Sequence, residues 1–465
     1  MPRVPSRLEV RPARRAGFRR PIGALLLAAA LGALAAGAAA AAPLAPEAPP
    51  AASPPAPGGQ APDLAEAPAH PLAPLAELAA EVERRGLPAA LPDGLAQSGT
   101  WRSVAVEGAT CGRGAPYTFY LNESAAANAG IVILLDGGGA CLKEGPAPAG
   151  TTGIARSLHC MDFENFEDPL MNDSLFTGLL ASIIVPQVLP IFSRGPENPL
   201  RDDHFVALPY CTGDVFAGTM RQAYDYDPSE ARFDVVHRGH LNVLGVLAWL
   251  YRNYPEDRPV LLTGLSAGGF GAIYNFPDVI ERWPRSTLLP DSGIAPPIDD
   301  SLLAREGARV AARWGADTLI PYYCKAADCL SSSYRLLAAH AAQYDGSPAD
   351  WRPFGLLQGQ QDGTLTAYLE TTACSYQQGL RRGRGEARPE NLRAYLPATD
   401  KHVFSAINPL AGETPFVSRR GLRFLDWFMQ LASAAAPSDL PADAIDPWLP
   451  CNPTFLPLGL VGGAR

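Results

Sequence analysis

The sequence has few of the residues from which metal sites and phosphate-binding loops are built. Only seven of its 465 residues are histidines, and its eight cysteines include no Cys-x-x-Cys pair. His237 and His240 stand three residues apart on a predicted helix, where packing or a helix-surface role explains them better than metal binding. No glycine-rich stretch is followed by Lys-Ser or Lys-Thr, as a phosphate-binding P-loop requires. We therefore expect no metal and no other cofactor.

Basic residues are scarce beyond the N-terminus. Residues 1–42 carry seven arginines, followed by an uncharged Ala/Leu-rich stretch at 22–42, which indicates an export signal or an uncleaved anchor just long enough to span a bilayer. The remainder has 31 basic and 46 acidic residues, a net charge of −15, which argues against binding nucleic acid. Its one basic cluster, 381–384, is expected to be a solvated loop. We expect a secreted, periplasmic or cell-surface protein, held at a membrane only if the N-terminal segment is retained.

The composition also divides the rest of the chain. Residues 43–74 contain eleven prolines among alanines and predict an extended spacer; 75–100 predict a short helical lead-in, and 101–465 one large domain, expected to be a monomer. All eight cysteines fall after residue 100, and an even number in an exported chain indicates disulfides. About 105 pairings are possible, so the pairing stays open, although Cys324 and Cys329 could close a small local loop.

Short apolar runs alternate with helical patterns through this domain. The predicted strands are 117–121, 131–135, 205–209, 260–263, 287–290, 354–357 and 392–396. The predicted helices include 240–254, 268–275, 302–314, 330–344 and 418–433. This alternation predicts an α/β fold, a mostly parallel sheet with flanking helices. The Pro-rich stretch 142–203 is expected to be an irregular insertion that caps one end of the sheet.

One motif carries the chemistry. Residues 264–269 read Gly-Leu-Ser-Ala-Gly-Gly between a predicted strand and a predicted helix, which is the context of a nucleophile elbow. The small neighbours let the chain turn back sharply while Ser266 is held in a strained conformation. A glycine-rich structural turn is the alternative, and the flanking strand and helix favour a catalytic serine.

A serine nucleophile needs a base, and the base needs an acid that orients it. Of the two histidines after Ser266, His340 lies in an alanine-rich helical pattern and His402 in a polar loop after a strand, so His402 is the predicted base. Asp362 and Asp291 both follow strands. Asp362 belongs to the strand just before the one that leads to His402 and is the preferred acid, with Asp291 shaping its loop by accepting hydrogen bonds from backbone amides.

The strand at 131–135 opens into Asp-Gly-Gly-Gly-Ala-Cys at 136–141. Such a loop resembles the glycine-rich oxyanion loop of lipases and esterases. The predicted oxyanion donors are the amides of Gly138, Gly139 and Ala267.

Together these motifs resemble the pectin acetylesterase / Notum family. The matching segments are 135–141, 209–218 (Pro-Tyr-Cys-Thr-Gly-Asp-Val-Phe-Ala-Gly), 264–269 and 289–293. The resemblance implies an α/β-hydrolase fold with Ser266, Asp362 and His402 as catalytic residues. The chain departs from the family at Ala140, because family loops usually carry a tryptophan beside this cysteine. That departure leaves the acyl and sugar specificity open.

The resemblance further implies an exported serine esterase that hydrolyses O-acyl esters, above all O-acetyl esters, of a polysaccharide or a small molecule. One alternative is a lipid-type carboxylesterase or deacylase. Another is a cell-surface binding protein that keeps the fold without the chemistry.

Overall fold

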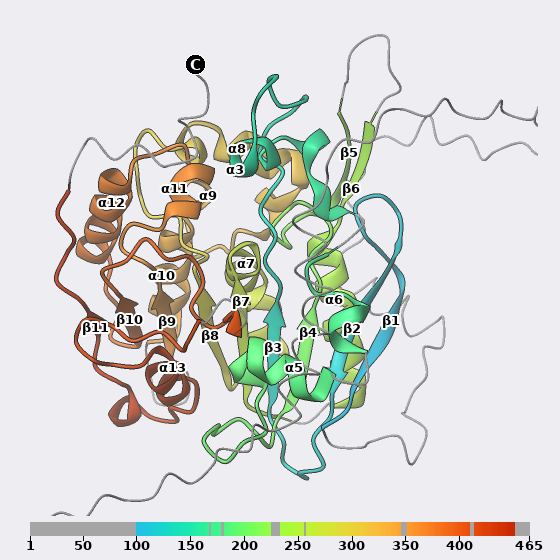
Figure 1. Ribbon diagram of the computed structural model, residues 1–465, viewed down its shortest axis with the longest axis vertical. Helices are drawn as coiled ribbons and strands as arrows, with labels where there is room; N and C mark the ends of the chain where they lie inside the picture. The colour runs from blue at the N-terminus through green and yellow to red at the C-terminus, as the bar shows by residue number, and fades with distance from the viewer. Residues whose placement is uncertain are drawn as a thin grey trace, which may run out of the picture. The chain divides into compact units, whose positions relative to one another are not determined.

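The predicted parallel sheet forms the centre of the structure. The computed structural model describes residues 99–166, 169–177, 181–224, 233–254, 257–345, 351–409 and 413–451, and apart from Glu413 these belong to one compact unit. Figure 1 shows the main sheet, whose strands pair in the order β1-β2-β4-β3-β7-β8-β9-β10-β11. From β4 to β11 the neighbours are parallel, whereas β1 and β2 form an antiparallel edge.

Most predicted strands match an observed strand to within one or two residues at each end. The main sheet contains β1 (Trp101–Thr110), β2 (Pro116–Asn122), β3 (Ile131–Leu135), β4 (His204–Leu208), β7 (Val260–Leu265), β8 (Ser286–Asp291), β9 (Phe354–Leu357), β10 (Leu392–Leu396) and β11 (Ala444–Ile445). A separate antiparallel pair consists of β5 (Met220–Tyr224) and β6 (Phe233–His237).

Both faces of the sheet are buried. Along β3, Ile131, Ile133 and Leu135 belong to one apolar cluster, and Val132 and Leu134 belong to another. A strand covered on both sides can be apolar at every position, which is why β3 reads as an uninterrupted apolar run.

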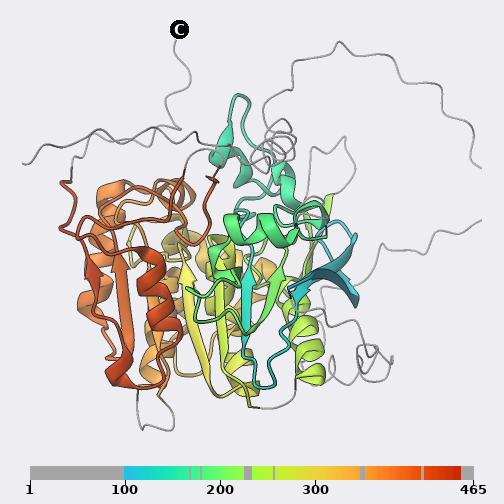
Figure 2. The same cartoon turned by 60° about the horizontal axis from the view of Figure 1, so that its bottom comes forward.

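Helices cover both of these faces. The first cluster receives side chains from α6 (Gly239–Asn253), α7 (Ala267–Arg282), α8 (Leu302–Trp314), α9 (Ala326–Ser331), α10 (Ser333–Gln343), α11 (Gly363–Tyr368) and α12 (Ala373–Glu386). The second receives side chains from α4 (Asp173–Phe176), α5 (Ala181–Val188) and α13 (Phe424–Ala432), which lie on the same side of the sheet in Figure 2.

The insertion at 142–203 has two parts. Its first part contains the one-and-a-half-turn helix α3 (Gly153–Ser157), which packs on α11 at the carboxyl end of the strands. Its second part packs on a face of the sheet, where Phe176, Val185 and Phe192 bury against β3 and β4. The prediction of a cap is therefore correct for the first part only. The second part, with α4 and α5, covers a face of the sheet instead of its end.

Several helix predictions needed correction. The predicted helix 330–344 is two helices, because the side chain of Ser332 accepts a hydrogen bond from Arg335 N and caps α10. The predicted helix 268–275 continues through Pro277 to Arg282, and the predicted helix 418–433 is limited to α13.

The basic cluster 381–384 was predicted to be a loop and lies within α12. Its arginines are held by contacts, since Arg382 pairs with Asp299 and Arg384 with Asp443.

Within the part of the chain that the structure describes, no helix has the length and apolar character needed to cross a membrane. The predicted signal or anchor (1–42), the spacer (43–74) and residues 75–98 of the lead-in lie outside the described residues.

Candidate active site

Ser266 occupies a sharp turn between β7 and α7. Its backbone adopts φ 53° and ψ −114° at the N-cap of α7, a region that non-glycine residues rarely enter and that stores strain. The Ser266 amide donates to the main-chain carbonyl of Asp291 over 2.9 Å, which fixes the turn to the end of the neighbouring strand. The hydroxyl thus stands at the start of a 16-residue helix, whose N-terminal end favours negative charge.

The glycines around the serine are required by close backbone approaches. A Cβ at Gly264 would collide with the carbonyl of Gly268, and one at Gly268 would collide with the carbonyl of Leu135. A Cβ at Gly269 would lie 2.8 Å from the Cα of Gly293. The motif that singled out Ser266 in the sequence therefore has a steric cause, namely the tight contact of α7 with the ends of β3 and β8.

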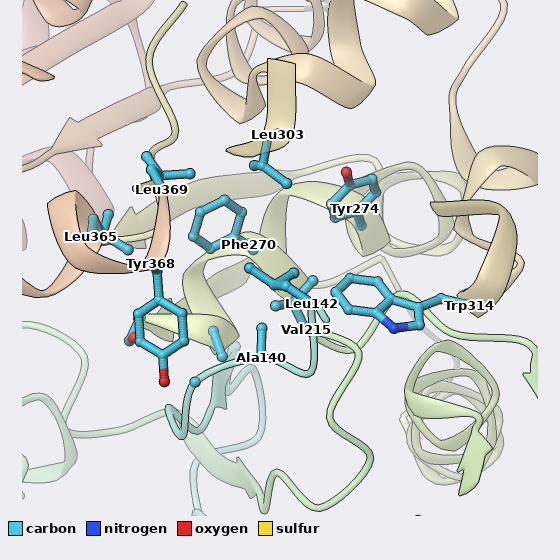
Figure 3. A pocket seen from close by; sticks show the side chains of 13 residues that line it. Ala140, Leu142, Val215, Phe270, Tyr274, Leu303, Trp314, Leu365, Tyr368 and Leu369 are labelled. Carbon is cyan, nitrogen blue, oxygen red and sulfur yellow. The ribbon is translucent and has the colours of Figure 1, made fainter. Parts of the chain in front are cut away.

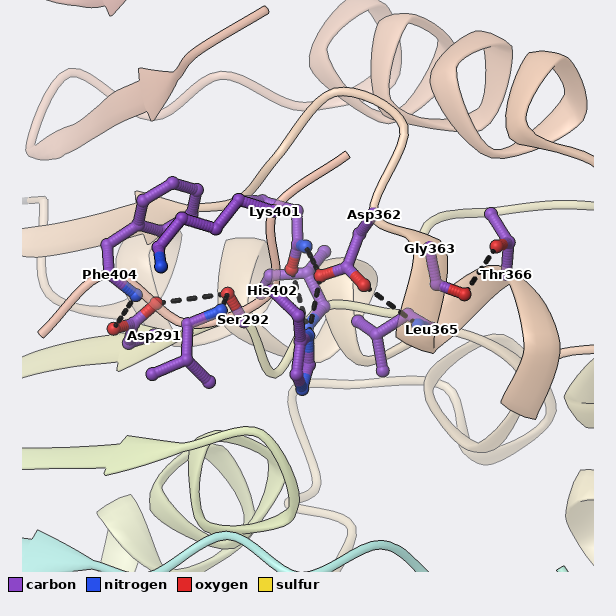
Figure 4. A network of polar contacts seen from close by, with 12 residues as sticks. Asp291, Ser292, Asp362, Gly363, Leu365, Thr366, Lys401, His402 and Phe404 are labelled. Carbon is purple, nitrogen blue, oxygen red and sulfur yellow. Dashed lines mark hydrogen bonds and ion pairs between the residues drawn. The ribbon is translucent and has the colours of Figure 1, made fainter. Parts of the chain in front are cut away.

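Asp362 and His402 are brought together at the carboxyl ends of β9 and β10. The His402 Nδ1 donates to Asp362 Oδ2 over 2.7 Å, and the Asp362 side chain is fully buried. The other Asp362 oxygen accepts from Leu365 N over 2.8 Å and caps α11. Figure 4 shows the carboxylate between these two donors. Gln358 Nε2 adds a third hydrogen bond at 2.6 Å, so the carboxylate is held rigidly.

The opposite edge of the His402 ring is unused. Nε2 is buried and has no hydrogen-bond partner within the described part of the chain. Because the carboxylate can only accept, Nδ1 carries a proton, and Nε2 of the neutral ring is then an acceptor. An imidazole with this arrangement is ready to take a proton from a hydroxyl group.

Asp291 has a different task. Its buried carboxylate accepts hydrogen bonds from Phe404 N at 2.8 Å and from Ser405 N at 2.7 Å, and also from the hydroxyl groups of Ser292 and Ser405. Burial raises the pKa of Asp291, and these hydrogen bonds oppose the shift. Among the described residues, Asp291 makes no hydrogen bond with His402. It instead holds the backbone that follows the histidine.

The glycine loop after β3 lies against the elbow, with the Cβ position of Gly137 3.4 Å from the Cβ of Ser266. Gly139 and Ala267 line the same pocket as Ser266, whereas Gly138 is not among the lining residues. Within the described ranges, the amides of Gly138, Gly139 and Ala267 donate to no protein group. The carbonyl of Gly138 accepts from Asn165 Nδ2 over 2.7 Å, and this contact braces the loop.

The segment 209–218 is a buried support. Asp214 Oδ1 accepts from the hydroxyl of Thr212 and from Phe216 N, and its Oδ2 accepts from Gly239 N at the start of α6. Burial raises the pKa of Asp214 to about 6. Val215 and Phe216 have positive φ angles of 50° and 58°, and this turn carries Val215 into the pocket. The motif therefore positions pocket residues, a role that its sequence alone did not reveal.

The pocket beside Ser266 is almost entirely apolar. It has an empty volume of about 530 Å³, part of it open to solvent. In Figure 3, Leu365 and Tyr368 lie at one end, Tyr274 and Trp314 at the other, and Phe270 between them. The remaining lining residues are Gly139, Ala140, Leu142, Val215, Ser266, Ala267, Leu303 and Leu369. Most of them could not be predicted from the sequence, because they come from short elements and loops far apart in the chain.

Three disulfides brace the molecule. Cys324–Cys329, a local pairing that the sequence left open, is one of them. The other two are Cys111–Cys211, which joins the end of β1 to the segment 209–218, and Cys141–Cys160, which ties the glycine loop to the insertion. Cys374 and Cys451 are free thiols in this structure. Disulfides on this scale are typical of an oxidising compartment.

Three further histidines, His237, His240 and His340, serve packing. His340 is buried, with Nε2 donating to the carbonyl of Ile273. The prediction that His237 and His240 share a helix was wrong, because His237 ends β6 and His240 lies on α6. They bond to different partners, the carbonyl of Thr212 and the side chain of Asn275. Among the described residues, no group of three or more His, Cys, Asp or Glu side chains is arranged to hold a metal ion.

Comparisons with known proteins bear on the family and on the fold. Residues 197–303 match the model of the family described as Pectinacetylesterase, a stretch that contains the elbow and two of the other three motifs. The resemblance drawn from the sequence is thereby confirmed. The matched stretch includes Ser266 and ends before Asp362 and His402.

Among solved structures, the chain is similar to the Wnt deacylase Notum from Drosophila in two crystal forms. One has a TM-score of 0.52 and 16% identity, covering 76% of this chain and 99% of that one. The other has a TM-score of 0.48 and 15% identity, covering 76% and 98%. The first likeness, with the mostly parallel sheet, confirms the α/β-hydrolase fold. No curated protein matches the sequence.

Proposed function

We propose that this chain is an exported serine esterase that uses Ser266, His402 and Asp362 to hydrolyse O-acyl esters. One observation carries the proposal. His402 is oriented by a fully buried carboxylate 2.7 Å from Nδ1, while its buried Nε2 has no partner. His340, which serves packing, has both ring nitrogens hydrogen-bonded. His159 also has a buried unpartnered nitrogen, so the orienting Asp362 carboxylate is what distinguishes His402.

In the proposed reaction, His402 Nε2 takes the proton of the Ser266 hydroxyl as Oγ attacks the ester carbonyl carbon. The negative charge that develops on the carbonyl oxygen is stabilised by the amides of Gly139 and Ala267, with Gly138 as a further candidate. His402 then gives its proton to the departing alcohol oxygen, and the acyl group stays on Ser266. Water, deprotonated by His402, releases the acid and restores the serine. Asp362 keeps Nδ1 protonated and stabilises the charged ring throughout.

The family match supports an O-acetyl ester of a polysaccharide as the substrate, with neither metal nor organic cofactor taking part in the steps above. The N-terminal segment 1–42 and the three disulfides support export. The acyl part of the ester would occupy the apolar pocket next to Ser266, and the alcohol part would face solvent.

A second candidate, a deacylase for longer acyl chains, is favoured by the pocket itself. Leu142, Phe270, Leu303, Trp314 and Leu369 contribute apolar surface that an acetyl group would leave largely uncovered. Each buried methylene is worth about 0.8 kcal/mol, so a chain of four to eight carbons would bind more tightly than acetate.

Hydrolysis of nitrophenyl acetate, butyrate and octanoate by the full chain tests the proposal, with Ser266→Ala as the reference. Activity restricted to acetate and lost in the variant supports a deacetylase, and acetylated polysaccharides would follow as substrates. Activity that rises with chain length and still requires Ser266 supports the second candidate. Equal rates for the folded wild type and the variant would contradict any esterase and leave the binding-protein alternative.

A further inference from the structure

We propose that Tyr368 selects the acyl group by walling the pocket beside the reacting carbonyl, so that acyl groups branched at the carbon next to the carbonyl are excluded. This inference rests on the proposed function and names a specificity-determining residue for it. The loop 137–140 beside Ser266 consists of three glycines and Ala140. It therefore offers no side chain large enough to limit the pocket there.

The space beside this loop is filled from α11. A Cβ placed on Gly139 would collide with the hydroxyl of Tyr368 and lie 3.0 Å from its Cζ. The ring thus rests on the very residue whose amide is proposed to hold the carbonyl oxygen. Since that oxygen is bonded to the acyl carbon, the ring lies next to the first atoms of the acyl group rather than next to its far end, where Trp314 lies (Figure 3).

The ring is held in place from both sides. Its hydroxyl lies 2.9 Å from the hydroxyl of Ser157 on α3, and Lys143 of the insertion forms an ion pair with Glu370, two residues beyond Tyr368. At its other end α11 is capped by Asp362. A wall fixed at both ends of a six-residue helix cannot move aside for a branched acyl group without disturbing these contacts.

Substitutions of Tyr368 test the wall. We would measure kcat/KM of the full chain for nitrophenyl butyrate and nitrophenyl trimethylacetate, which share the alcohol and differ in branching. Tyr368→Ala should raise the trimethylacetate-to-butyrate ratio by about tenfold or more, the scale on which pockets discriminate added methyl groups. Tyr368→Phe and Ser157→Ala keep the ring and should leave the ratio within about twofold, whatever their effect on overall rate. Tyr274→Ala, at the far end, should alter chain-length preference instead.

An unchanged ratio in Tyr368→Ala, with both rates lowered equally, would overturn the inference and make the ring a structural support of α11. A shift in alcohol preference at constant acyl group would also overturn it, by placing the ring on the leaving-group side.

A binding measurement separates this inference from the proposed function. Dissociation constants for butyrate and trimethylacetate can be followed through protein fluorescence, because Trp314 lines the pocket. Tyr368→Ala should tighten trimethylacetate relative to butyrate, even in a Ser266→Ala background. If this shift occurs but the wild-type protein hydrolyses no ester, the role of Tyr368 is supported and the esterase function is contradicted. If the variant binds both carboxylates as the wild type does, the role of Tyr368 is contradicted.

A different observation carries a second inference. We infer that Cys374 and Cys451 form a fourth disulfide in the exported protein, closing the chain after β11 onto α12. Burial and the neighbouring Cys451 thiol raise the pKa of Cys374, and these are the two cysteines that the other disulfides leave free.

Neighbouring contacts already bring the two segments together. Gln377 Nε2 on α12 donates to the carbonyl of Leu449 over 2.9 Å, and the Arg381 guanidinium stacks on Trp448 with 4.6 Å to the ring centre. The two thiols would each lose a hydrogen as the S–S bond forms. The two electrons and two protons would pass to the disulfide of a thiol oxidoreductase or of oxidised glutathione, which is reduced to its dithiol or thiol form.

Alkylation of the denatured, unreduced full chain with iodoacetamide, followed by peptide mass mapping, tests this bond in protein recovered from an oxidising compartment. We expect a Cys374–Cys451 cross-linked peptide and no alkylation at either residue, with Cys141–Cys160 as the internal control for oxidation. Alkylation of both cysteines in material whose control disulfide is closed would overturn the inference.

Discussion

The side chain of Asp291 and the main-chain amide of Phe404 are joined by a 2.8 Å hydrogen bond across 113 residues of sequence. The main-chain carbonyl of the same aspartate accepts the Ser266 amide. One buried residue therefore sets both the turn that presents the proposed nucleophile and the loop that presents the proposed base.

Replacement of Asp291 should therefore impair stability and catalysis together. Asp291→Ala leaves the buried amides of Phe404 and Ser405 without an acceptor, at about 1–3 kcal/mol for each buried group. We expect a marked loss of unfolding free energy in urea and a fall in kcat, because the His402 loop loses its anchor. Asp291→Asn can still accept from both amides and should recover part of each loss. Wild-type kcat in folded Asp291→Ala would contradict a positioning role.

Replacement of Asp362 by asparagine should impair the chemistry far more than the folding, because asparagine can still cap α11. Asp362→Asn can present an amide to His402 and favour the wrong tautomer, so kcat should fall by about 10³–10⁴. Asp400→Asn is the matched control, since Asp400 is exposed and lies two residues before His402. Steady-state kinetics of the two variants would decide between them. A large loss in Asp400→Asn with little in Asp362→Asn would reassign the acid.

The strained backbone at Ser266 should lower the stability of the protein in a way that substitutions can measure. Glycine adopts positive φ without cost, whereas alanine does not. Ser266→Gly should therefore unfold at higher urea concentration than Ser266→Ala, by about 1 kcal/mol in free energy, and both should be inactive. Equal stabilities would show that the turn carries little strain.

The buried His340 should make the folded protein less stable in acid. Burial lowers its pKa to about 4 in the folded state, while the unfolded value is about 6.5. Between these values the unfolded chain binds one more proton, so stability falls as pH drops from about 6.5 to about 4, by roughly 3 kcal/mol in all. His340→Gln removes that proton uptake. The change in unfolding free energy between pH 7 and pH 4.5 should be smaller in the variant than in the wild type, and equal changes would contradict the assignment.

The sequence predicted best what burial and close packing impose locally. β3, β9 and β10 were predicted with their observed bounds because buried parallel strands are continuous apolar runs. The elbow could be recognised because no other residue fits at its glycines. A Cβ added to Gly264 or Gly268 would collide with backbone atoms.

Other elements were missed because tertiary contacts overrule local preference. α12 contains three glycines, at 379, 383 and 385, which disfavour a helix. Two of them are needed, since a Cβ on Gly379 or Gly383 would press on Ile298 or Tyr334. α11 is only six residues long, too short for a recognisable apolar pattern, so the sequence did not place Tyr368 on a helix. Asp362 is a typical N-cap residue, and it was the one signal from which α11 could have been predicted.

The most direct test of the central claim is covalent labelling of the full chain with a fluorophosphonate, read by intact mass and peptide mapping. We expect one adduct per chain, located on Ser266, with no labelling of Ser266→Ala and strongly slowed labelling of His402→Ala. Folded wild-type protein that takes up no label, or that is labelled at another serine, would contradict the assignment of Ser266 as an activated nucleophile.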